Sequence, residues 1–119
     1  MTTIAHTESG TALEQTLTWW QREDLCYQDG DLYFAGQSVA NLVREVRTPG
    51  FVYSMDRVRQ NLMRLHTALD KAGLKDRHTL LYAMKANRFA PLLAALKHSG
   101  LCGIDACSPR EVEHAVSCG

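Results

Sequence analysis

The feature that most constrains the fold is an alternation of short apolar strands and amphipathic helices that begins at Phe51. Strands are expected at residues 51–53, 79–84 and 101–105, and a helix follows each one. Each helix carries residues that favour a helix start or a helix end. Ser54 and Ser108 can cap helix starts, and Pro91 suits a first turn. Gly73 and Gly100 stand where helices are expected to end. Repeated strand–helix units predict a parallel sheet with right-handed crossovers.

The segment before residue 48 has a different pattern. Residues 25–28 and 31–34 are short apolar stretches on either side of Asp29-Gly30, a dipeptide that favours a tight hairpin because both positions need positive φ. Ser38 can cap a helix whose inner face carries Val39, Leu42, Val43 and Val46, and Thr48-Pro49 ends it. Residues 1–10 are expected to be a disordered lead and residues 11–22 a short helix. We therefore divide the chain into residues 1–47 and residues 48–119.

Lys85 is the residue with the clearest chemical meaning. The apolar strand expected at residues 79–84 stops abruptly on Lys85, and Asn87 follows two positions later. In parallel α/β folds, active-site groups lie at the carboxyl ends of the strands. We expect apolar walls beside Lys85, and apolar surroundings favour the neutral amine that makes a Schiff base. The alternative is an ordinary surface lysine just past a strand.

Asp105 and Glu111 are the other candidate site residues. Asp105 ends the third expected strand, so it should lie at the same edge of the sheet as Lys85. Its alternative role is to bond nearby loop amides. Ser108 and Glu111 have the spacing of a capping box, in which each side chain bonds the other residue's backbone N–H. Glu111 therefore either caps a helix or borders the site, and Asn87 is interpreted as a structural turn residue.

Four pieces of the chain resemble the pyridoxal-phosphate (PLP) decarboxylases of the diaminopimelate, ornithine and arginine group. They keep the order and spacing of that family, and they are residues 48–53, Asn61, residues 82–87 and residues 103–111. The resemblance runs from about Leu25 to Gly119, and the lysine motif followed by Asp-x-x-Ser-x-x-Glu is its most specific part. Two departures are Met84, where relatives often have valine, and Pro109-Arg110, which replaces a glycine-containing pair.

The resemblance implies both a fold and a cofactor. The fold would be the N-terminal part of a PLP-binding (β/α)8 TIM-like barrel of the alanine-racemase type, made of the first three βα units in residues 48–119. The hairpin would join a β-rich second domain. Lys85 would form the Schiff base with PLP, Asp105 would lie close to the cofactor, and Glu111 would border it. The intact enzyme would be a homodimer.

The closest resemblance is to diaminopimelate decarboxylase, because an Asp-Gly hairpin and a short helix precede Thr48-Pro49. The expected reaction is meso-diaminopimelate to L-lysine, in lysine biosynthesis. The alternatives are a decarboxylase of ornithine, arginine or a carboxylated polyamine such as carboxynorspermidine, a non-catalytic relative that binds a protein partner, and an α/β fragment without activity. A PLP racemase fits the Asp-x-x-Ser-x-x-Glu segment less well. Three strands cannot close a barrel of eight, so the chain is expected to be an N-terminal piece, either a fragment or a natural truncation, that is inactive alone.

Composition excludes some classes of function. Acidic and basic residues balance at 13 each, which does not favour a nucleic-acid or membrane surface. The first fourteen residues contain no apolar signal-peptide core. Four cysteines without a C-x-x-C pair are typical of reduced thiols, so we expect a cytoplasmic protein. The five histidines lack metal-ligand spacing, and no metal site is expected.

Overall fold

A computed structural model of the protein describes residues 22–119. The chain divides into two compact units, Met1–Arg47 and Thr48–Gly119, and the division coincides with the boundary placed between residues 47 and 48 from the sequence. The lead expected at residues 1–10 and nearly all of the helix expected at residues 11–22 lie outside the described residues. Every helix in residues 22–119 is too short or too polar to span a lipid bilayer.

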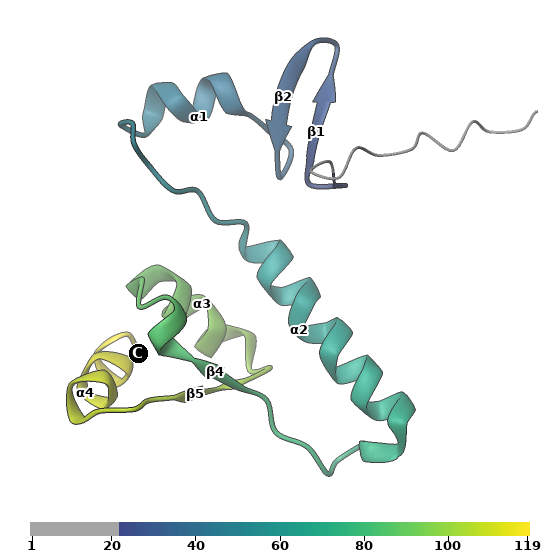
Figure 1. Cartoon of the computed structure of the whole chain (residues 1–119), viewed down its shortest axis with the longest axis vertical. Coiled ribbons are helices and arrows are strands. Elements are labelled where there is room, and N and C mark those ends of the chain that lie inside the picture. The colour runs from purple at the N-terminus through teal and green to yellow at the C-terminus, as the bar shows by residue number, and fades with distance from the viewer. Residues whose placement is uncertain (1–21) are drawn as a thin grey trace, which may run out of the picture. The chain divides into compact units, whose positions relative to one another are not determined.

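The first unit contains the predicted hairpin. Strands β1 (Leu25–Gln28) and β2 (Asp31–Phe34) pair antiparallel, with Gln28 opposite Asp31 (Figure 1). Asp29 and Gly30 form the turn, with φ values of 51° and 89°. The hairpin prediction is confirmed, because these two residue types tolerate the positive φ that a two-residue turn requires.

A third strand was not predicted. Ala35 and Gly36, with φ values of 49° and 76°, turn the chain back so that β3 (Gln37–Ser38) pairs with β2. The predicted helix follows as α1 (Val39–Glu45), but the prediction of a capping bond from Ser38 was wrong. Ser38 stands at the N-cap position and its side chain makes no capping bond. It also ends β3, where its backbone is paired with Tyr33.

The second unit is built from two strands and three helices. Its elements in order are α2 (Met55–Leu69), the π-helical turn η1 (Asp70–Leu74), β4 (Leu81–Ala83), the 3-10 turn η2 (Met84–Ala86), α3 (Ala90–Ser99), β5 (Gly103–Asp105) and α4 (Pro109–Ser117). Strands β4 and β5 pair in parallel, with α3 as the crossover between them (Figure 1). The parallel pairing of the second and third expected strands is therefore confirmed.

The prediction of a strand at residues 51–53 was wrong. This segment has no regular secondary structure and belongs to neither sheet of the described residues, and Phe51 is 86% exposed. A strand exists only where a neighbouring backbone accepts its hydrogen bonds, and β5 is the neighbour of β4 in this sheet. The segment is instead attached through a side chain, because the Tyr53 ring stacks on the Phe89 ring at 5.5 Å between centroids.

The core of the second unit is small. Its buried apolar side chains are Met84 and three leucines of α3, Leu92, Leu93 and Leu96. From α2, three partly buried side chains pack against them: Met55, Val58 and Leu62. The C-cap conformation expected of Gly100 is confirmed by its φ of 64°, and Gly73 likewise has a φ of 80° within η1. Ser54 and Ser108 accept capping bonds as predicted. Leu65 continues the apolar three- and four-residue spacing of Val58 and Leu62, which predicts an inward position, but it is 53% exposed.

Candidate functional site

Lys85 lies two positions past the end of the strand β4, inside the turn η2. The strand predicted at residues 79–84 is shorter, because β4 ends at Ala83. Met84 is fully buried and attaches this turn to the core, whereas the next side chain, Lys85, is exposed. Within the described residues the Lys85 amine makes no hydrogen bond or ion pair, and the apolar surroundings expected for it are absent. The amine is therefore accessible from solvent.

Asp105 is the last residue of β5 and stands opposite Ala83 in the parallel ladder. Because the ladder runs parallel, the carboxyl ends of both strands meet at one edge, and η2 begins at the same edge. Asp105 and Lys85 thus lie at one edge of the sheet, as the topology predicted. Both side chains are exposed, and no salt bridge joins them within residues 22–119.

Glu111 is the buried member of the candidate set, at 6% exposure. Its backbone N–H donates to Ser108 Oγ at 3.2 Å, which confirms one half of the capping box. The reciprocal half was wrong, because Glu111 Oε2 accepts from the N–H of Cys107 at 2.7 Å and not from that of Ser108. Its other oxygen, Oε1, pairs with Arg88 Nη2 at 2.8 Å. Both carboxylate oxygens therefore have partners within the fold.

Asn87 fixes the connection from β4 to α3, the structural role interpreted from the sequence. Its Oδ1 accepts from the N–H of Phe89 at 3.0 Å, and its Nδ2 donates to the hydroxyl of Tyr53 at 3.0 Å. Its carbonyl accepts from the hydroxyl of Tyr82 at 3.3 Å. Burial first, and the nearby Tyr53 second, raise the pKa of Tyr82. Three side chains therefore hold the segment that directly follows Lys85.

Sequence reasoning missed Arg88 and Tyr53 as partners of the candidate residues. Arg88 comes before α3 and pairs with a residue of α4, so no local spacing indicates the contact. Tyr53 lies 34 positions from Asn87, and the predicted strand gave its side chain no partner. No group of three or more histidine, cysteine, aspartate or glutamate side chains in residues 22–119 is arranged to hold a metal ion.

No protein-family model, no curated protein and no solved structure matches this chain.

Proposed function

We propose that residues 48–119 provide the lysine-bearing part of a PLP-dependent amino-acid decarboxylase with a (β/α)8 barrel. The observation that carries this proposal is the unpartnered amine of Lys85, two positions past β4 and at the same sheet edge as Asp105. The unit β4–α3–β5 is a parallel strand–helix–strand crossover, the repeating unit of such barrels. The preferred substrate is meso-diaminopimelate, with L-lysine as the product.

The residues present fit PLP in two respects. An exposed lysine amine without a partner can attach to an aldehyde, and a carboxylate at the same edge favours the protonated form of a nearby nitrogen. PLP, when bound, supplies an electron sink for the bond that is broken. Lys85 would hold the cofactor and move protons through Nζ, and Asp105 would set the charge beside it. Glu111 would position the segment after Asp105 without touching the cofactor, because both its oxygens already have partners, the N–H of Cys107 and Arg88.

The proposal concerns a protein in which further strands close the barrel. The described part of this chain contributes two parallel strands, and eight are needed. In that protein the β1–β2 hairpin would belong to a β-rich domain, and the enzyme would be a cytoplasmic homodimer of lysine biosynthesis. Ornithine, arginine and carboxylated polyamines are the alternative substrates.

The first experiment tests attachment of PLP to the chain itself. The chain would be incubated with PLP and reduced with borohydride, and the modified lysine would be identified by peptide mass spectrometry. We expect modification at Lys85 well above that at Lys97, which is also exposed but lies on α3. Lys85→Ala should remove the main product, and Lys97→Ala should not. Equal modification of all four lysines would contradict the assignment of Lys85.

The second experiment tests decarboxylation. Residues 48–119 would replace the corresponding βα units of a characterised diaminopimelate decarboxylase, and carbon dioxide release from meso-diaminopimelate, ornithine and arginine would be compared. We expect activity on the first substrate, which Lys85→Ala reduces by several orders of magnitude because the covalent step is lost. A folded chimera that binds PLP and decarboxylates none of the three would contradict the proposal.

A further inference from the structure

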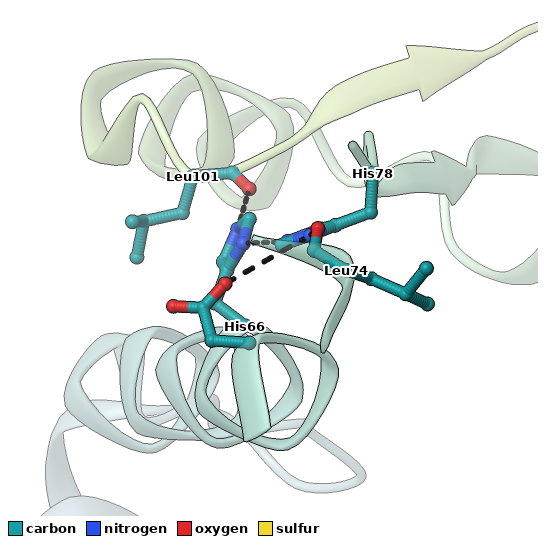
Figure 2. Close-up of polar contacts among 5 residues, drawn as sticks. His66, Leu74, His78 and Leu101 are labelled. Atoms are coloured by element: carbon teal, nitrogen blue, oxygen red, sulfur yellow. Dashed lines mark hydrogen bonds and ion pairs between the residues drawn. The ribbon is translucent and has the colours of Figure 1, made fainter. Parts of the chain in front are cut away.

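Two histidines of the second unit form a continuous chain of hydrogen bonds between two backbone carbonyls. His66 Nε2 lies 2.6 Å from the carbonyl oxygen of Leu101, and His66 Nδ1 lies 2.7 Å from His78 Nε2. His78 Nδ1 lies 2.8 Å from the carbonyl oxygen of Leu74. Figure 2 shows the two rings between these carbonyls. We call His66 and His78 the histidine pair.

The partners of the pair fix its number of protons. A carbonyl oxygen only accepts, so His66 Nε2 and His78 Nδ1 must each carry a hydrogen. If both rings were neutral, the two remaining nitrogens would present lone pairs to each other at 2.7 Å. A short contact between two nitrogens is a hydrogen bond only when one of them carries a proton. A pair that makes all three of these contacts as hydrogen bonds carries three protons on four nitrogens, which corresponds to one positive charge.

The surroundings are compatible with that charge. The carboxylate of Asp70, on η1, lies 4.0 Å from His78 Nδ1, and the Asp70 side chain is 44% exposed. The His78 side chain is only 12% exposed. On the turn from α3 to β5, the group that contacts His66 is the carbonyl of Leu101. The titratable residue next to Leu101 in the sequence is Cys102. The charged residues beside His78 along the chain are exposed: Lys75, Asp76 and Arg77.

The pair joins three segments that are distant in sequence. His66 belongs to the last turns of α2, His78 precedes β4, and Leu101 precedes β5. These contacts lie at the amino ends of the two parallel strands, whereas Lys85 and Asp105 lie at the carboxyl ends. In strand–helix barrels the amino-end face contributes stability and the carboxyl-end face contributes catalysis.

We propose that His66 and His78 share one proton, and that this proton makes the attachment of α2 to the starts of β4 and β5 sensitive to pH. The inference is independent of the decarboxylase proposal. Loss of the proton leaves two lone pairs in contact, so the 2.7 Å bond between the rings must break. Gain of a second proton puts two donors in the same gap, with the same result.

The effect of pH on stability follows from the count of bound protons. Above about pH 6.5, the two histidines of an unfolded chain are neutral, whereas the hydrogen bond between the folded rings requires one extra proton. The folded state then binds more protons, so the free energy of unfolding falls as pH rises until the shared proton leaves. Below about pH 6.5, the two histidines of the unfolded chain bind one extra proton each, whereas the folded pair binds one in total. The free energy of unfolding therefore falls as the pH decreases. Stability should therefore have a maximum.

Nitrogen-15 NMR of the full-length chain tests the shared proton directly, in solution or in the solid state if the chain associates. At about pH 6, near the titration range of histidine, we expect a scalar coupling between His66 Nδ1 and His78 Nε2. We also expect hydrogens on His66 Nε2 and His78 Nδ1. Raising the pH should abolish the coupling before the chain unfolds. Absence of the coupling throughout the titration would overturn the proposal, and so would a coupling that does not change with pH.

A matched pair of variants tests the consequence for stability. His78→Gln removes the shared proton, so the pH maximum in the urea midpoint should disappear. His98→Gln is the control, because His98 is exposed and, within residues 22–119, its ring bonds the carbonyl of Ala94 in its own helix and no other group. The control should keep the maximum of the wild-type chain. Identical pH profiles for all three proteins would overturn the proposal, and the NMR measurement on the wild-type chain gives the answer if His78→Gln does not fold.

Discussion

Arg88 Nη2 lies 2.8 Å from Glu111 Oε1, and this ion pair joins the segment before α3 to the first turn of α4. Its two members differ in environment, because the Glu111 side chain is 8% exposed and the Arg88 side chain is 62% exposed. An arginine in contact with water contributes little through its charge. The larger contribution of Glu111 should come from the bond that its other oxygen accepts from the N–H of Cys107.

Glu111→Ala should therefore lower the free energy of unfolding by about 1–2 kcal/mol, the range for a lost helix cap with a weak ion pair. Glu111→Gln should cost less, because its amide oxygen can still accept from Cys107. The control is Glu113→Ala on the exposed side of α4, which should change stability by about 0.5 kcal/mol or less. Urea denaturation measures all three, and equal losses at positions 111 and 113 would contradict the assignment.

Local patterns predicted much of the fold correctly. The Asp29-Gly30 turn, the caps at Ser54 and Ser108, and the glycine that ends α3 depend on φ and on hydrogen bonds within a few residues, which the sequence specifies directly. The parallel pairing of β4 and β5 followed from strand–helix alternation. These features need no knowledge of distant parts of the chain.

Errors arose where a distant partner determines the outcome. Leu65 and His66 both continue the helical spacing of Leu62, and apolarity favoured Leu65, yet His66 is the one that faces inward. Its partners are His78 and the carbonyl of Leu101, 12 and 35 positions away. The four-residue step from Leu62 to His66 was the available signal that His66 faces inward. It favours His66 over Leu65 only when the partners of His66 are known. The predicted strand at residues 51–53 failed for the same reason, because no neighbouring backbone pairs with it among the described residues.

The candidate site was predictable in position but not in surroundings. Strand ends placed Lys85 and Asp105 at one edge of the sheet, and the structure places both there. The prediction of apolar walls around Lys85 depended on elements distant from residues 81–105, and in the described residues its side chain is exposed. The chemical roles of both residues therefore stay predictions.

A double-mutant cycle on Asn87 and Tyr53 should show coupling, because Asn87 Nδ2 donates to the Tyr53 hydroxyl at 3.0 Å. Asn87→Ala should cost about 0.5–1 kcal/mol more in the wild-type background than in Tyr53→Phe, the usual net value of one hydrogen bond. The bond from Asn87 to the N–H of Phe89 is present in both backgrounds and cancels. Strictly additive losses in urea denaturation would mean that the contact with Tyr53 contributes no stability.

Tyr82 should ionise at higher pH than free tyrosine. Burial raises its pKa above the ordinary value of 10.0, and the proximity of Tyr53 adds to the effect. Because the folded chain then holds a proton that the unfolded chain has lost, this residue's contribution to stability should fall as pH rises above about 10. The ultraviolet titration of the wild-type chain minus that of Tyr82→Phe isolates this phenol. Tyr53→Phe should move the difference curve part of the way back, and a Tyr82 midpoint at or below that of free tyrosine would contradict the burial.

Cys102 should react slowly with iodoacetamide while the second unit is folded. Its thiol packs against the core formed by Met84 and the α3 leucines, and burial raises its pKa. The thiolate is the reactive form, so at neutral pH both low access and low ionisation should slow the reaction. Cys107 is the internal control, since it is exposed and lies five residues away, on the connection from β5 to α4, whereas Cys102 directly precedes β5. Peptide mass spectrometry would measure both rates in one sample, and in urea the two rates should become similar. Equal rates without urea would show that the core of residues 48–119 is not packed in this chain.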